Sequence, residues 1–78
     1  MPMITVEVTE NTAANLAKLV KRCNEAERAR NGSTSHGELT IQDLLAMMAE
    51  DAAYIIKRPG CWEATNMRDV INAHGYDF

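Results

Sequence analysis

Hydrophobic and polar residues alternate near the start of the chain. Ile4, Val6 and Val8 are β-branched and are separated by single polar residues. A period of two in such residues predicts a β-strand with one buried face, here over residues 3–9. A lone strand leaves its backbone donors and acceptors unpaired, so we expect it to pair with the same strand of a second copy.

The pattern then changes to a helical period. Apolar residues three and four positions apart predict a helix over residues 12–30. Asn11 or Thr12 is the expected N-cap, and the helix should end at Asn31 and Gly32, which both tolerate left-handed φ. The predicted apolar face consists of Ala13, Leu16, Leu19, Val20, Cys23 and Ala26.

A second helix is predicted over residues 41–57. Thr40 followed by Asp43 resembles a capping box with Asp in place of Glu. Pro59 and Gly60 end the helix, because proline disfavours helical geometry in the residue before it and glycine releases the chain. The wide apolar stripe consists of Ile41, Leu44, Leu45, Met48, Ala52, Ile55 and Ile56, with Met47 and Tyr54 nearer the polar side.

A short third helix is predicted over residues 65–74. Met67, Val70 and Ile71 lie on one side of it, and Gly75 before Tyr76 suits a left-handed C-cap. The predicted fold class is therefore mainly α with one short N-terminal β-strand. Its elements are strand, helix, helix and short helix, within a single domain over residues 1–78.

Composition adds an expectation about oligomeric state. The 78 residues are 46% hydrophobic but only 5% aromatic, so the core must be built from small aliphatic side chains. A chain this short has little core of its own and often gains stability from a partner subunit, so we expect a homodimer. The net charge of -3 lies entirely in the second half: residues 1–40 carry five basic and five acidic residues, and residues 41–78 carry three and six.

Several classes of protein are not expected from the sequence. Two cysteines are too few for a disulfide framework. The chain does not begin with the basic residues and apolar stretch of a signal peptide, so we expect a cytoplasmic protein. No apolar run reaches the ~20 residues that cross a membrane. Cys23 and Cys61 lie far in sequence from His36 and His74, so no metal site is predicted. There is also no glycine-rich phosphate loop, and we expect no cofactor and no enzymatic activity.

The order of the predicted elements resembles the ribbon-helix-helix family of Arc-like and MetJ-like repressors. The resemblance covers residues 4–8, 12–30 and 40–57. It implies a dimeric DNA-binding transcriptional regulator, whose paired strands enter the major groove. It also implies that Thr5, Glu7 and Thr9 on the strand face the bases, and that the start of the second helix, at Thr40, binds a phosphate. Lys18, Lys21 and Arg22 in the basic stretch of the first helix are the candidate phosphate-binding residues of such a regulator; the alternative is that this stretch is a solvated helix face.

An alternative function is a small protein-interaction module without DNA binding, of the kind formed by phage or plasmid inhibitors and adaptors. The acidic second half of the chain and its single tryptophan favour this alternative. Trp62 is expected to staple the third helix to the core, or else to anchor a partner. The candidate partner-binding residues are Trp62, Met47, Tyr54 and Glu50.

Overall fold

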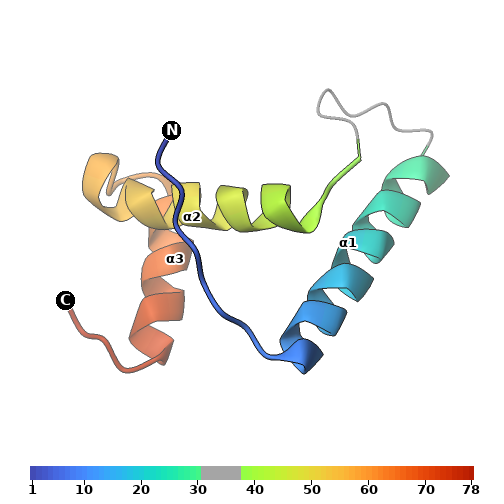
Figure 1. The fold of residues 1–78 in the computed structure, drawn as a ribbon. Coiled ribbons are helices and arrows are strands. Elements are labelled where there is room, and N and C mark those ends of the chain that lie inside the picture. The colour runs from blue at the N-terminus through green and yellow to red at the C-terminus, as the bar shows by residue number, and fades with distance from the viewer. Residues whose placement is uncertain (31–37) are drawn as a thin grey trace. The chain divides into compact units, whose positions relative to one another are not determined.

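The computed structural model describes residues 1–30 and 38–78, and its secondary structure there consists of three helices (Figure 1). They are α1 (Glu10–Ala29), α2 (Ile41–Lys57) and α3 (Trp62–Ala73). The chain divides into two compact units, Met1–Ile41 and Gln42–Phe78, which are described in turn. The predicted helix end at Asn31 and Gly32 lies outside the described residues.

The predicted N-terminal strand is wrong. Within residues 1–30 and 38–78 the structure contains no β-strand, and residues 1–9 run as an extended segment into α1. Ile4 is 87% exposed and Val8 is 51% exposed, so the alternating residues have no buried face. A strand exists only where a second strand completes its hydrogen-bonded ladder, and alternation alone does not supply one. The predicted ribbon-helix-helix fold is therefore wrong as well.

Helix α1 begins earlier than predicted because Thr9, not Asn11 or Thr12, is its N-cap. Thr9 has extended backbone angles, with φ -69° and ψ 160°, and its Oγ1 accepts a hydrogen bond from the Thr12 amide at 3.1 Å. Its carbonyl accepts the first helical hydrogen bond, from the Ala13 amide at 3.0 Å. Glu10 then stands in the first turn, where a carboxylate interacts favourably with the positive end of the helix.

The predicted apolar face of α1 is only partly covered. Val20 is buried and Leu16 is half-buried, whereas Leu19 and Cys23 are exposed. The expectation that Cys23 lies on a buried face is therefore wrong. Helical spacing identifies which residues share a face, but the amount of that face that is covered depends on what packs against it.

A side-chain amide ties α1 to the residues that precede α2. Asn24 accepts a hydrogen bond from the Leu39 amide at 2.8 Å through Oδ1, and its Nδ2 donates to the Leu39 carbonyl at 3.0 Å. Both residues are half-buried. Arg28, one turn after Asn24, lies 3.6 Å from the Glu38 carboxylate, although both side chains are largely exposed. The two amide hydrogen bonds are the main tether, because exposed ion pairs contribute little stability.

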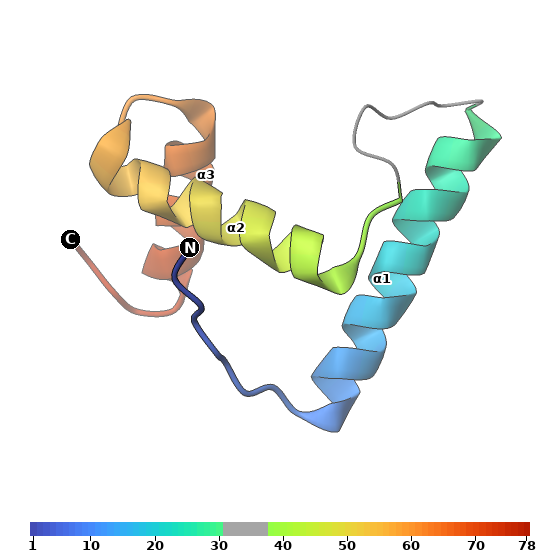
Figure 2. The ribbon, with the colours of Figure 1, turned by 45° about the horizontal axis from the view of Figure 1, so that its top comes forward.

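Helix α2 has the predicted bounds, Ile41–Lys57. Arg58, Pro59, Gly60 and Cys61 form the turn that follows, closed by a hydrogen bond of 3.1 Å from the Cys61 amide to the Arg58 carbonyl. Proline suits the second position of such a turn because its φ is already fixed near the required value. Helix α3 then starts beside the C-terminal half of α2 (Figures 1 and 2).

Helix α3 begins at Trp62, three residues before the predicted start. Cys61 takes the N-cap position with extended backbone angles but makes no side-chain capping hydrogen bond. Cysteine is not a usual cap residue, so the sequence carries no local signal for this start. Ala64, in the first turn, is 1% exposed and is the buried residue of this unit. At the other end, Arg68 donates a hydrogen bond to the Phe78 carbonyl and lies over the Phe78 ring, 4.6 Å from its centroid.

The predicted left-handed cap at the end of α3 is confirmed. Gly75 has φ +95°, its amide donates to the Asn72 carbonyl at 2.9 Å, and the Tyr76 amide donates to the Ile71 carbonyl at 3.3 Å. This pair of hydrogen bonds defines a Schellman motif.

We expect Gly75→Ala to lower the free energy of unfolding by about 1 kcal/mol, because an L-residue is strained in the left-handed region. A Cβ at Gly75 would meet no atom within 4 Å, so this cost is purely that of the backbone. Gly60→Ala is the matched control: it has equal space and no left-handed φ, and should leave stability unchanged or slightly raised. Urea denaturation of both variants measures the difference. Equal midpoints would contradict the strained geometry at Gly75.

Candidate interaction surfaces

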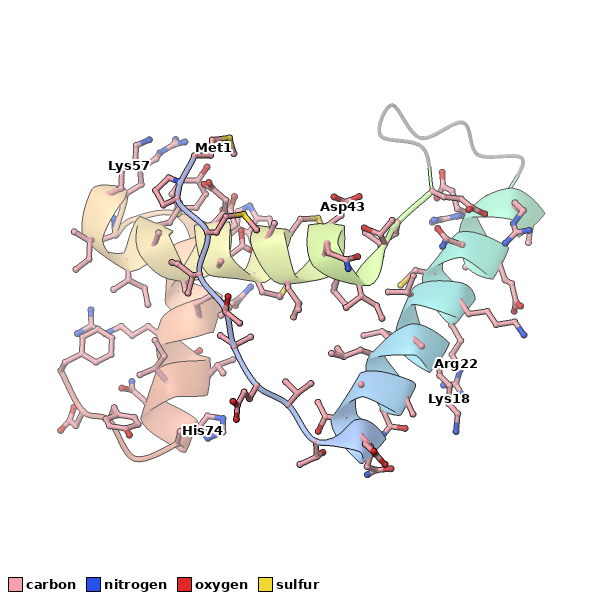
Figure 3. All side chains as sticks on the ribbon, in the orientation of Figure 1. Met1, Lys18, Arg22, Asp43, Lys57 and His74 are labelled. Carbon is pink, nitrogen blue, oxygen red and sulfur yellow. The ribbon has the colours of Figure 1, made fainter. Side chains whose placement is uncertain are left out.

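The basic residues of α1 form one exposed cluster. Lys18, Lys21 and Arg22 are spaced by three and four residues, so they share a face of the helix. Figure 3 shows Lys18 and Arg22 projecting from the same side of α1. All three side chains are exposed to solvent.

The other residues predicted to bind DNA do not form a reading surface. Thr5 and Glu7 are exposed on the extended N-terminal segment, and the Thr9 side chain is engaged as the cap of α1. Thr40 is exposed immediately before α2. Base reading by Thr5, Glu7 and Thr9 requires a two-stranded ribbon in the major groove, and the described residues form no strand. The ribbon-based DNA-binding hypothesis therefore has no structural basis.

Three of the four residues predicted to bind a partner protein share one face of α2. Met47, Glu50 and Tyr54 are separated by three and four residues, which places them in line along the helix. Met47 and Glu50 are exposed and Tyr54 is half-buried. Arg58 lies over the Tyr54 ring at 5.8 Å from its centroid, a cation–π contact at the end of the same line. We call Met47, Glu50 and Tyr54 the mixed face.

Trp62 is the fourth predicted residue and is exposed at the start of α3. Its exposed fraction is 70%, so the expectation that it staples the helix to the core is wrong. Trp62 is the single tryptophan of the chain. Tryptophan is enriched among the residues that dominate binding energy at protein interfaces.

A second face of α2 is apolar. Leu45, Ala49, Ala52 and Ile56 follow one another at intervals of four, three and four residues, which is the spacing of a coiled-coil seam. Ile56 is 87% exposed, Leu45 and Ala49 are exposed, and Ala52 is half-buried. We call these four residues the apolar seam. It lies on the opposite side of the helix from Met47, as the rotation of 100° per residue requires.

Little apolar surface is buried in the part of the chain that the structure describes. Val20 and Ala64 are the buried apolar residues there, and α2 has none although most of its residues are apolar. Single exposed apolar side chains are ordinary, but contiguous ones mark surfaces that bind other molecules. The mixed face and the apolar seam are therefore candidate interaction surfaces, and sequence reasoning identified the first but not the second.

The described residues present no alternative site of another kind. Among them, no group of three or more His, Cys, Asp or Glu side chains is placed to hold a metal ion. Cys61 is half-buried and Cys23 is exposed, both as free thiols, while His36 lies outside the described residues. None of the three helices is long and apolar enough to cross a membrane.

Comparison of the chain with protein families, with curated proteins and with solved structures finds no match.

Proposed function

We propose that this chain is a small helical interaction module that binds another protein through the mixed face of α2 and Trp62. The observation that carries this proposal is the line of Met47, Glu50 and Tyr54 along one helix face, with an exposed tryptophan at the start of the next helix. Helices that dock into a groove on a partner use anchors with this spacing, and Trp, Tyr and Met are enriched in such interfaces.

The charge of the chain indicates the chemistry of the partner. Residues 41–78 carry twice as many acidic as basic residues, and Glu50 lies within the mixed face. Opposite charges across an interface accelerate association and exclude wrong partners. The expected partner surface is an apolar groove bordered by basic side chains. Binding there would let the module act as an inhibitor or an adaptor.

Site-directed photocrosslinking tests this proposal in the cells that make the chain. A benzophenone amino acid at position 47 should crosslink one defined protein, because this position lies in the proposed interface. The control is position 19 in α1, because Leu19 and Met47 are equally exposed, at 46% each. The same crosslinked proteins from both positions would contradict a specific interface on α2.

The crosslinked protein, once purified, gives the quantitative test. Trp62→Ala should weaken its binding to the full chain by at least about tenfold, as for a typical anchor residue. Glu50→Lys should slow association and reduce its salt dependence. Leu19→Ala should leave the affinity unchanged.

Two outcomes would overturn the proposal. One is unchanged affinity in both Trp62→Ala and Glu50→Lys. The other combines two results: no protein is crosslinked, and the chain is retained on duplex DNA at low salt. This retention would have to be lost when Lys18, Lys21 and Arg22 are changed to glutamate, because phosphate binding depends on such cations.

A further inference from the structure

The apolar seam has a symmetry that the rest of α2 lacks. Its residues read large, small, small, large along the helix: Leu45, Ala49, Ala52 and Ile56. The intervals of four, three and four are the same in both directions. Reversing the helix therefore places a large residue on each large position and a small residue on each small one.

Such a pattern is self-complementary for two antiparallel copies of the helix. In the register centred between Glu50 and Asp51, Leu45 of one copy lies level with Ile56 of the other, and Ala49 lies level with Ala52. A two-fold interface has this property by definition, because each residue pair occurs twice with the roles exchanged. The central alanines let the two backbones approach to the short end of the 8–10 Å range for packed helices.

The helix dipoles also favour an antiparallel partner. An antiparallel copy places the positive end of each helix dipole next to the negative end of the other. Asp43 in the first turn and Lys57 in the last turn both point away from the seam, because each residue turns the helix by 100°. Glu50 and Asp51, nearest the two-fold axis, both point away from the seam, on opposite flanks of the helix. No like charges therefore meet across the seam.

The small size of the second unit favours an additional source of stability. Gln42–Phe78 is shorter than the ~40 residues below which domains usually need a disulfide, a metal or oligomerisation. Its cysteine is a free thiol, and the described residues hold no group of metal-binding side chains. Its apolar seam is exposed, with Ile56 at 87%. Of disulfide formation, metal binding and oligomerisation, the exposed apolar seam favours oligomerisation.

We infer that the apolar seam binds a second copy of this chain, forming an antiparallel α2–α2 homodimer. This association is independent of the proposed function, because the mixed face lies on the other side of α2. The dimer leaves both copies of the mixed face free. One assembly therefore presents two equivalent binding surfaces, which raises its avidity for a partner with two sites.

Sedimentation equilibrium of the full chain tests this inference. The wild-type chain should have twice its 8.7 kDa monomer mass at micromolar concentration, with a thermal midpoint that rises with concentration. Ile56→Ser should raise the dimer dissociation constant by at least about tenfold, since each dimer loses two buried isoleucines. Because Ile56 is so exposed in a single chain, this variant should keep its fold.

Met47→Ser is the matched control, because it also removes an exposed apolar side chain from α2 but from the opposite face. It should leave the dimer intact while weakening partner binding, so failure of the dimer and failure of the proposed function are distinguishable. A wild-type monomer at roughly 100 micromolar would overturn the inference, since even a weak specific dimer forms at that concentration. The inference would also be overturned if Ile56→Ser and Met47→Ser lowered the mass measured by sedimentation equilibrium to the same extent.

A charge pair tests the register. Ala49→Glu should dissociate the dimer, because it places two unpaired carboxylates in the seam. Adding Ala52→Lys to the same chain should restore the dimer, because each carboxylate then lies level with a lysine of the other copy. If the double variant stays monomeric while its circular dichroism is that of the wild type, the antiparallel register is wrong.

Discussion

Replacement of Ala64 by leucine is expected to unfold most of the second unit. Ala64 is 1% exposed in the first turn of α3, so the atoms that cover it must shift to admit a larger side chain. Overpacking of this kind typically costs about 1–3 kcal/mol, because side chains and backbone must shift to admit the added atoms. That is a large part of the stability available to so short a segment.

Circular dichroism and urea denaturation measure this effect, with Ala53→Leu as the matched control. Ala53 is exposed on α2, so the same substitution there meets no packed neighbour. Alanine and leucine are both strong helix formers, which keeps the propensity change small in both variants. We expect the Ala64→Leu variant to lose helical signal, whereas the Ala53→Leu variant retains it. Equal unfolding midpoints would mean that α3 is not packed at Ala64.

Local signals in the sequence predicted the features of the fold that depend on nearby residues. The bounds of α2 follow from the Thr40 start and the Pro59-Gly60 stop, and the cap at Gly75 follows from the φ that glycine tolerates. The predicted N-terminal strand was wrong because a strand depends on a distant partner, which a period of two does not supply. The predicted start of α3 was late because Cys61 caps it through backbone geometry alone.

For the candidate interaction surfaces, too, the sequence predicted what depends on nearby residues and not what depends on distant ones. The common face of Met47, Glu50 and Tyr54 follows from helical spacing once α2 is placed. The exposure of Trp62 does not follow from the sequence, because a tryptophan beside a helix start is equally compatible with packing inward. The apolar seam was hidden within the wide stripe of α2. The exposure of Leu45, Ala49 and Ile56 separates the seam from half-buried positions such as Leu44 and Ile55.

These two surfaces explain why α2 is so apolar without having a buried residue. The half-buried residues Leu44 and Ile55 lie on a third face of α2, and the apolar seam and the mixed face flank this face on either side. The additional apolar surface is what a helix needs when it must also bind other chains.

Replacement of Asn24 by leucine should release the residues that precede α2 from α1. This substitution removes both hydrogen bonds to Leu39 while keeping a side chain of similar size. Each bond contributes about 1 kcal/mol, so we expect a loss of about 2 kcal/mol in the free energy of unfolding. The loss is not larger because the site is half-buried and water can replace part of the bonding.

The amide of Leu39 provides a direct readout of this tether. Its hydrogen exchange should be slow in the wild-type chain and much faster in Asn24→Leu, because Asn24 Oδ1 accepts from this amide at 2.8 Å. Asn15→Leu is the matched control: Asn15 is an exposed asparagine of the same helix, and leucine there should slightly stabilise α1 through its higher helix propensity. Unchanged exchange at Leu39 in Asn24→Leu would mean that the tether does not form in solution.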